Sequence, residues 1–390
     1  MSGVRLRGIT WNHSRALPPL VAAAQRFEEL HPEVRIVWEK RSLDEFGHAS
    51  LSALSRSYDM LIIDHPMLGD VRRDGALIDL GPRLSREALA GLQAEVLGLC
   101  LESYCYETSL YALPIDAAAP AASFRPDLLE RHGRQAAVRW EELIDLARRG
   151  LVRMPGFPPD LFLNFMGMCV SRGSFVAGGD HLFDHAIASR CLEEMRELAA
   201  LMPDTIYAMN PIALYEAMAS GDEFAYCPFA YTYSNYSRPG FAANALLFAN
   251  PVALMDGIPM RTVLGGTGIG ISTGCKDVDV AIDFCLFVAG RDCQTHLYGM
   301  CGGQPASRSA WRDPLLNQVS NSFFERTFGS IETAYVRPRY PGYIALQRTG
   351  GEVVAAFLKH GITAAEALQR LDHLYRSSLP QAPSRLGVTE

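Results

Sequence analysis

The chain has 390 residues, of which 48% are hydrophobic and 20% are charged, a composition typical of a globular protein with about two or three domains. Its formal net charge is -7 and it has no long basic run, which argues against nucleic acid as the main partner. Its apolar runs are all shorter than the ~18 residues that a transmembrane helix requires.

Strands and helices alternate through the first 65 residues. Hydrophobic spacing predicts short strands separated by helices, and the third strand is a continuous apolar run of the kind found in the centre of parallel sheets. This order predicts right-handed βαβ units in an open α/β sheet. The predicted strands cover residues 4–10, 34–38 and 58–64; the first helix ends near His31, and the second covers about 43–55.

Polar and aromatic side chains follow two of these strands. Trp11, Asn12 and His13 come after the first strand, and Asp64 and His65 lie at the C-terminal end of the third. In open α/β sheets, ligands bind outside the C-terminal ends of the strands. We therefore expect these side chains to lie at a ligand-binding edge.

The middle of the chain contains one small-residue segment and one aromatic segment. Residues 111–116 are expected to cross between two lobes, and the alanine-rich residues 117–122 show no periodic pattern. Residues 224–236 begin as a strand and continue as an aromatic loop. Tyr231 and Tyr233 face the same side if this segment stays extended.

Four glycines distinguish residues 263–272, namely Gly265, Gly266, Gly268 and Gly270. Their spacing suits a dinucleotide-binding loop, but that motif requires a helix directly after the glycines. Here another strand follows. We therefore interpret the segment as a glycine-rich crossing that re-enters a sheet and faces a cleft.

Five landmarks occur in an order that is typical of one protein family. They lie at residues 27–32; 58–64 with 75–80; 111–114 with 124–129 and 140–143; 264–272; and 302–305. Between about Val4 and Tyr375, the chain resembles the extracellular solute-binding proteins of family 1, the substrate receptors of carbohydrate-type ABC importers. The resemblance implies an α/β, two-lobed periplasmic-binding-protein type II fold. Each lobe would be an open mixed sheet flanked by helices, and hinge crossings would join the two.

The resemblance also implies how the chain is divided. Lobe 1 would comprise residues 1–113 and 257–303, lobe 2 would comprise residues 114–256 and 304–376, and residues 377–390 would form a loose tail. The expected hinge crossings lie near Pro114, at Asp256 and Gly257, and from Gly303 to Pro305. The lobes would close about these crossings onto a solute.

Ten residues are candidate ligand contacts under this resemblance. Trp11 is expected to stack on a sugar ring or to lie in the core. Asp64 and Asp116 are expected to accept solute hydroxyls or pair with a cation, although Asp64 also suits a helix cap. The full candidate set is Trp11, Asn12, His13, Asp64, His65, Asp116, Tyr231, Tyr233, Gly266 and Thr267.

The other candidates also have two interpretations each. His65 suits a ligand donor or a strand end, and Tyr231 and Tyr233 suit either a cleft wall or packing under a loop. Thr267 would offer a hydroxyl, alongside backbone amides. Arg337 suits a ligand carboxylate or, more simply, a structural ion pair.

The expected function is non-catalytic binding of a small polar solute, sugar-like or a small organic acid, for an ABC importer. The expected partners are that solute and ABC permease subunits. We expect a monomer with no cofactor, no metal, no catalytic residue and no nucleic-acid partner.

Three other functions remain open from the sequence. His181 and His185 have metal-ligand spacing for a helix, but no third ligand is evident and a solvated helix start explains them. Cys293 and His296 suggest a cysteine hydrolase, yet they lie on a predicted helix without a glycine elbow. A ferric-ion receptor of the same fold would use the tyrosines between residues 231 and 236.

The sequence and the resemblance suggest different cellular compartments for the protein. The first residues lack the apolar region of a secretory leader, and the 9 cysteines are odd in number and scattered. The chain as given therefore suggests a cytoplasmic ligand sensor that lost its transporter, whereas the resemblance suggests the periplasm.

Overall fold

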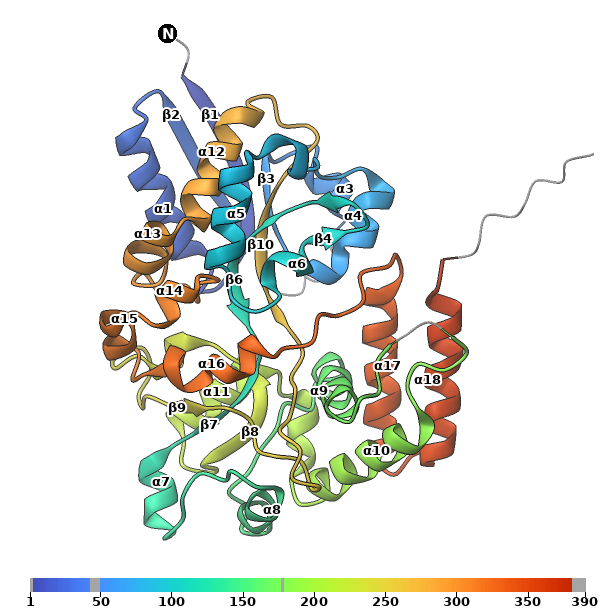
Figure 1. Cartoon of the computed structure of the whole chain (residues 1–390). Coiled ribbons are helices and arrows are strands. Elements are labelled where there is room, and N and C mark those ends of the chain that lie inside the picture. The colour runs from blue at the N-terminus through green and yellow to red at the C-terminus, as the bar shows by residue number, and fades with distance from the viewer. Residues whose placement is uncertain (1–2, 43–49, 177–178, 381–390) are drawn as a thin grey trace, which may run out of the picture.

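The computed structural model describes residues 3–42, 50–176 and 179–380, which build two main sheets, each with its own helices, and a small two-stranded hairpin (Figure 1). The first sheet is mixed, with the order β2-β1-β3-β10-β6. β1 pairs in parallel with both β2 and β3, and β10 lies antiparallel between β3 and β6. Its strands are β1 (Val4–Trp11), β2 (Val34–Arg41), β3 (Met60–Ile63), β6 (Leu113–Ala118) and β10 (Gly265–Ile271).

The first three strands form as their hydrophobic patterns predict. All four residues of β3 are buried, as expected for a central strand, and residues of β2 alternate between buried and exposed at its start. Helices α1 (Leu17–Leu30) and α12 (Val278–Ala289) pack together, with Phe27 edge-on to Phe284 at 5.4 Å between ring centroids. The expected helix over residues 43–55 lies partly outside the described residues; the described part contains α3 (Leu51–Leu54).

The second sheet is smaller and antiparallel, with the order β8-β7-β9. It consists of β7 (Pro120–Phe124), β8 (Tyr226–Tyr231) and β9 (Leu247–Ala249). In Figure 1, most of the helices between residues 126 and 220 gather around this sheet, and α17 and α18 stand beside it. These helices are α7 (Pro126–Arg131), α8 (Trp140–Arg148), α9 (Pro158–Ser171), α10 (His185–Ala199), α11 (Pro211–Ser220), α17 (Tyr343–Leu358) and α18 (Ala364–Ser378).

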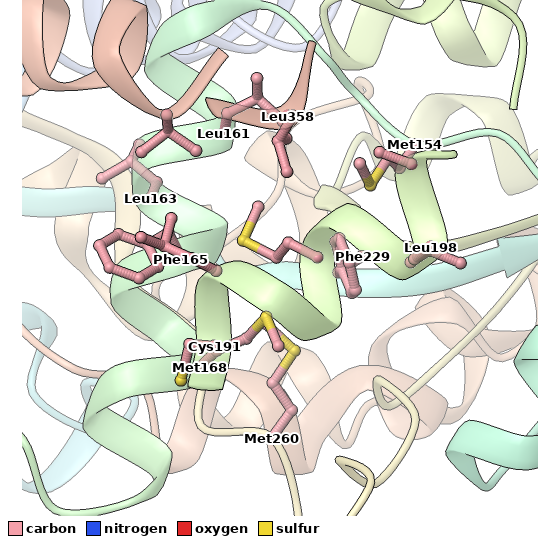
Figure 2. Close-up of a cluster of buried hydrophobic side chains, with 14 of the residues drawn as sticks. Met154, Leu161, Leu163, Phe165, Met168, Cys191, Leu198, Phe229, Met260 and Leu358 are labelled. Atoms are coloured by element: carbon pink, nitrogen blue, oxygen red, sulfur yellow. The ribbon is translucent and has the colours of Figure 1, made fainter. Parts of the chain in front are cut away.

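Helix α9 is the centre of the largest apolar core. All of its residues from Leu161 to Val170 are buried, so it has no solvent-exposed face there. Met168, Cys191 of α10, Phe229 of β8 and Leu358 of α17 belong to this core (Figure 2).

The remaining elements cover the edges of the two sheets. A short hairpin joins β4 (Cys105–Tyr106) and β5 (Ser109–Leu110). The other helices of the described residues are α4 (Leu68–Asp74), α5 (Arg86–Glu95), α6 (Cys100–Ser103), α13 (Arg291–Cys293), α14 (Arg308–Trp311), α15 (Pro314–Val319) and α16 (Phe323–Glu332).

The chain passes between the sheets along adjacent segments. β6 leads through Ala119 directly into β7, so the alanine-rich run that showed no pattern is two buried strands. Beside it, Gln304 accepts a hydrogen bond from the amide of Ala117 at 2.9 Å. Leu264, just before β10, donates its amide to the carbonyl of Tyr335 at 2.8 Å.

The hinge crossing predicted at Asp256 and Gly257 is wrong. Asp256 and Gly257 form a turn, closed by a 2.7 Å hydrogen bond from the Gly257 amide to the Leu254 carbonyl. Asp256 is bound there by an ion pair of 2.8 Å to Arg172 at the end of α9. The glycine marks a turn with φ of +76°, and the chain enters the first sheet only at Gly265.

The glycines of β10 allow close packing in the middle of the first sheet. Gly266 has φ of +100°, and a Cβ atom there would overlap the backbone of Asp116 and Ala117. At Gly265, a Cβ atom would lie 2.6 Å from Cε1 of Tyr231, so glycine lets that ring pack against the strand. The interpretation of this segment as a crossing strand is therefore confirmed.

Candidate functional site

A cavity of about 290 Å³ receives residues from both sheets and from three helices. β1, β3 and β10 open onto it from the first sheet, and the end of β8 opens onto it from the second. Helices α9, α11 and α17 complete the wall. The lining residues are Trp11, Arg15, Asp64, Met67, Ala118, Phe157, Pro159, Asp160, Leu163, Asn210, Pro211, Ile212, Tyr231, Tyr233, Gly265, Gly266, Thr267, Arg337, Ile344, Gln347 and Arg348.

Six of the ten sequence-predicted residues meet at this cavity. They include side chains that are more than 250 residues apart in the chain, because β1 and β10 belong to the same sheet. Strand ends at one edge of the sheet bring them together, as the open α/β architecture predicts. The six are Trp11, Asp64, Tyr231, Tyr233, Gly266 and Thr267.

The other four predicted residues do not line the cavity. Asn12 is exposed, and His13 is half-buried behind the wall. His65 is 0% exposed and Asp116 is 1% exposed. Three of these four nevertheless contact residues of the wall, namely His13, His65 and Asp116.

Asp64 is bound by Arg337 in the cavity wall. Both carboxylate oxygens of Asp64 accept hydrogen bonds from Nη2 of Arg337 at 2.7 Å. Burial raises the pKa of Asp64, but the charge and hydrogen bonds of Arg337 together with the neighbouring His65 outweigh it and lower that pKa to about 2. The aspartate makes no side-chain cap at the following turn, so the interpretation of Asp64 as a helix cap is wrong and Arg337 is an ion-pair partner.

His65 is neutral beside this pair. Burial, followed by the charge of Arg337, lowers the pKa of His65 to about 4, although Asp64 acts in the opposite direction. Its Nδ1 lies 3.3 Å from Oδ1 of Asp64 without a hydrogen-bonding geometry, and neither ring nitrogen has a partner among the described residues. His65 therefore packs behind Asp64 as an uncharged ring.

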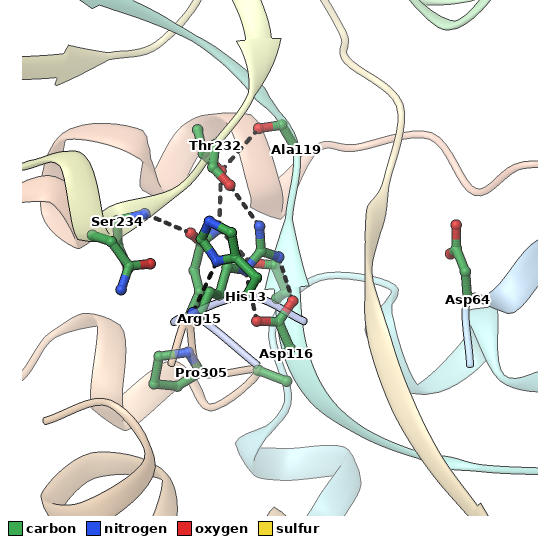
Figure 3. A network of polar contacts seen from close by, with 12 residues as sticks. His13, Arg15, Asp64, Asp116, Ala119, Thr232, Ser234 and Pro305 are labelled. Atoms are coloured by element: carbon green, nitrogen blue, oxygen red, sulfur yellow. Dashed lines mark hydrogen bonds and ion pairs between the residues drawn. The ribbon is translucent and has the colours of Figure 1, made fainter. Parts of the chain in front are cut away.

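A second arginine–aspartate pair ties the crossing strands together. Nε of Arg15 donates to Oδ2 of Asp116 at 2.8 Å, and Nη1 donates to the Thr232 carbonyl at 2.6 Å. Arg15 also lies over the ring of Tyr233, 4.9 Å from its centroid. Figure 3 shows Arg15 between Asp116 and Thr232, apart from Asp64. Arg15 thus packs on Tyr233 in the wall and neutralises Asp116, which does not itself line the cavity.

His13 and Gln304 complete this network. The Arg15 amide donates to Nδ1 of His13 at 2.9 Å, and the His13 ring meets Tyr233 edge-on at 4.8 Å. Gln304, fully buried, donates to the Ala117 carbonyl at 2.8 Å and accepts from the Ser234 amide at 3.0 Å. These contacts connect the residues that follow β1 to β6, to Gln304 and to the residues that follow β8.

Three polar groups of the wall have unused hydrogen-bonding capacity. Oη of Tyr231 and Oγ1 of Thr267 are buried without a hydrogen-bond partner among the described residues. The carboxylate of Asp160, in the first turn of α9, likewise has no ion pair or hydrogen bond in the described part of the chain, and burial raises its pKa to about 7. Buried polar groups are normally paired, so the hydroxyls of Tyr231 and Thr267 are suited to a polar ligand, and the half-buried Asp160 lines the same cavity.

Several residues of the cavity wall could not be identified from the sequence. Arg15 and Asp160 are isolated charged residues within predicted loop or helix starts, and Gln347 is one polar residue of a long helix. Only their placement around one cavity distinguishes them. Asp160 follows two prolines that start α9, which was a usable signal for a helix N-terminus but not for a ligand.

Residues 10–292 match the family described as bacterial extracellular solute-binding protein. The chain belongs to this family. The match covers most of the chain, including every strand of both sheets apart from the first residues of β1. Solute binding, without conversion of the solute, is therefore the function of the chain, and the hypothesis of a metal-dependent enzyme is wrong.

Solved structures of the same fold agree with this assignment. The maltose-bound MalE3 of T. maritima superposes with a TM-score of 0.80 at 18% identity, over 96% of this chain and 100% of that chain. An ABC transporter solute-binding protein of Agrobacterium radiobacter K84 in complex with ribitol gives 0.78 at 19% identity, over 95% and 98% of the two chains. One from Thermotoga lettingae bound to alpha-D-tagatose gives 0.80 at 16% identity, over 97% and 100%. The predicted two-lobed fold is confirmed.

The helices of the described residues do not include one with both the length and the apolar character needed to cross a bilayer.

Proposed function

We propose that the chain binds one small polyhydroxylated solute, a sugar or a polyol, in the 290 Å³ cavity between the two sheets. The observation that carries the proposal is the meeting of three aromatic rings with unpaired polar groups in one wall. Trp11, Tyr231 and Tyr233 supply apolar ring faces, and Thr267 and Asp160 supply hydrogen-bonding groups. Sugars and polyols present both C–H faces and hydroxyl edges, so both kinds of contact would be used.

The size of the cavity supports a compact solute. Its volume of about 290 Å³ lies at the lower end of the ~300–1,000 Å³ that small-molecule sites occupy. A monosaccharide, a linear polyol or a disaccharide suits this volume better than a long oligosaccharide. The bound solutes of three proteins with the same fold, maltose, ribitol and alpha-D-tagatose, fall in this class.

The charges of the wall favour a neutral solute over an organic acid. Arg337 is neutralised by Asp64, and Arg15 is neutralised by Asp116. The unpaired Asp160 would repel an anion when ionised. A carboxylate ligand would therefore have to displace an existing ion pair or bind at the exposed Arg348, whereas hydroxyl groups need displace no ion pair.

The ferric-ion alternative has less support. Burial raises the pKa of Tyr233 to about 12 and raises that of Tyr231 as well, which disfavours the phenolate form that would bind the ion. In addition, Tyr236 points away and donates its hydroxyl to Glu216 at 2.6 Å.

The transport role follows from the family. We propose that the solute-loaded form docks on ABC permease subunits outside the cytoplasm, as a monomer, rather than acting as a cytoplasmic sensor. The first lobe would be residues 1–118 with about 264–303, because β6 and β10 belong to the first sheet, and the second lobe would be residues 119 to about 263 with 304–376. We place the second crossing near Leu264, because residues before it pack with the second sheet.

A screen of thermal stability tests the solute class. Purified protein is melted with ribitol, D-tagatose, maltose and, for comparison, citrate, spermidine and ferric citrate. We expect a sugar or polyol to raise the Tm, because a ligand that binds only the folded state stabilises it by RT ln(1 + [L]/Kd). Titration calorimetry of each hit then gives the Kd. Stabilisation by carboxylates or ferric ion alone would contradict the proposal.

A further inference from the structure

A cluster of two histidines and one aspartate lies far from the cavity, at the contact between α10 and α18. His185 is the first residue of α10, and His181 lies in the loop before it, not on the same helix as the sequence suggested. Both rings turn towards Asp372 of α18, 187 residues further along the chain from His185. The third ligand that the sequence did not reveal is therefore supplied by another element.

The two imidazoles converge on one oxygen. Nδ1 of His181 lies 2.6 Å from Oδ2 of Asp372, and Nε2 of His185 lies 2.7 Å from the same Oδ2. The ring centroids are 4.3 Å apart. All three ligand atoms lie within 4.8 Å of one another. A single ion pair between a histidine and Asp372 would explain one such contact, but not the convergence of two aromatic nitrogens on one atom.

The aspartate is held in place and the histidines are open to solvent. Oδ1 of Asp372 accepts the Leu182 amide at 2.9 Å, which orients Oδ2 towards the rings. The Asp372 side chain is 6% exposed, whereas those of His181 and His185 are 60% and 43% exposed. A buried, hydrogen-bonded carboxylate with two accessible imidazoles resembles the supported ligand sets of metal sites, in which outer hydrogen bonds orient the ligands.

We propose that His181, His185 and Asp372 bind a zinc ion through Nδ1, Nε2 and Oδ2. Imidazole nitrogen and carboxylate oxygen are common zinc ligands, and a mixed set of this kind disfavours magnesium and calcium, which take oxygen ligands. Water would occupy the fourth position on the exposed side. With metal–ligand bonds of about 2.0–2.1 Å, tetrahedral ligands are roughly 3.3 Å apart. Oδ2 of Asp372 would therefore have to move about 0.6 Å further from each nitrogen, and the two nitrogens, which lie within 4.8 Å of each other, would have to approach by up to about 1.5 Å.

Zinc binding would change which nitrogen of each ring carries the proton. In the metal-free cluster, each ring donates a hydrogen bond to Asp372. When zinc binds, the coordinating nitrogens carry no proton, and the remaining proton of each ring lies on the other nitrogen. Of the nearby charged side chains, Arg376 donates to the carbonyl of Asp180, the residue before His181, at 2.7 Å, and Asp184 caps α10 through the Ile187 amide at 3.0 Å.

The ion would fasten α18 to the loop before α10. α18 packs on α17, and α17 contributes Ile344, Gln347 and Arg348 to the cavity wall. The metal is thus predicted to stabilise this side of the second lobe and not to contact the solute.

Titration of the whole, untagged, metal-free chain with zinc chloride tests the proposal. We expect one zinc per chain by calorimetry and elemental analysis, and a raised Tm. H181A and H185A are each expected to weaken zinc binding at least tenfold, and D372N is expected to do the same. H373A is the matched control, because His373 is an exposed histidine on the same helix, directly after Asp372.

Two results would overturn the proposal. One is no saturable zinc binding at 1:1 stoichiometry by the folded wild-type chain. The other is zinc binding by H181A and H185A, folded by circular dichroism, with the same affinity as H373A. Hydrogen exchange of residues 364–378 is a further measurement: zinc should slow it in the wild type and in H373A, but not in H181A.

Discussion

Tyr231 and Tyr226 belong to the same strand, but their hydroxyl groups have different surroundings. Oη of Tyr226 donates to the Ala137 carbonyl at 2.9 Å in the core, whereas Oη of Tyr231 has no partner among the described residues and its ring lines the cavity. The Tyr226 hydroxyl therefore stabilises the fold, whereas the Tyr231 hydroxyl is available to a solute.

We expect Y231F to weaken solute binding by about two- to tenfold, because one hydrogen bond contributes ~0.5–1.5 kcal/mol net. Its stability should not fall, since the lost hydroxyl is unpaired. Y226F should instead lose about 1–2 kcal/mol of unfolding free energy and keep the wild-type Kd. Calorimetry and urea unfolding of both variants measure the two effects. Equal Kd values for Y231F and the wild type would remove Tyr231 from the site.

His65 determines part of the pH dependence of stability. Its pKa is about 4 in the folded chain because burial opposes its charge, and about 6.5 when unfolded, so the unfolded chain binds the extra proton. Stability should therefore fall as the pH falls from about 6.5 to 4.

From pH 7 to pH 4.5, His65 is expected to cost about 2 kcal/mol of unfolding free energy. H65Q lacks this titration, so its stability should depend less on pH over that range, whatever its stability at pH 7. Urea unfolding of the wild type and H65Q at pH 7 and at pH 4.5 measures this pH dependence. H373Q, at an exposed histidine, should behave as the wild type. An unchanged pH dependence in H65Q would show that His65 is not the group that titrates.

At the level of elements, β10 connects the fold to the site. It lies between β3 and β6, and its glycines admit the Tyr231 ring and the backbone of Asp116. We expect G266A to lose at least ~2 kcal/mol of stability, because the Cβ atom adds a backbone clash to an unfavourable φ. G133A also has positive φ but faces open space, so about 1 kcal/mol is expected. Similar losses in both, measured by urea unfolding, would mean that close packing at Gly266 is unimportant.

Elements with strong periodicity could be predicted from the sequence. β1, β2 and β3 were found because apolar alternation and a continuous apolar run are local signals. β6 and β7 were missed in their alanine-rich part, since alanine suits several structures and only contact with β10 and β8 makes the run extended. The predicted crossing at Asp256 and Gly257 is wrong because the sequence does not distinguish a glycine in a turn from a glycine in a hinge.

Part of the candidate site was also predictable from these local strand signals. Trp11 and Asp64 directly follow predicted strands, so topology places them at the ligand edge. Asp116 could not be excluded, because its neutralisation by Arg15 joins residues 101 positions apart. The cluster of His181, His185 and Asp372 shows the same limit, since its third member lies on a different helix.

For the whole molecule, the account predicts a hinge motion. The segments around Ala119, Leu264 and Gln304 connect the two sheets, and the cavity lies beside them. We expect a saturating solute to lower the radius of gyration in small-angle X-ray scattering, as two lobes close on it. W11A should bind more weakly and need more solute for the same change. A radius of gyration that does not respond to a solute that raises the Tm would contradict closure.

The most direct measurement is a crystal structure of the chain with the sugar or polyol that raises its Tm most. The account predicts density for one intact solute against Trp11 and Tyr231, with a hydroxyl hydrogen-bonded to Thr267 or Asp160. Density for that solute at any other place, with this cavity filled only by water, would contradict it, as would density for a cleaved or modified product.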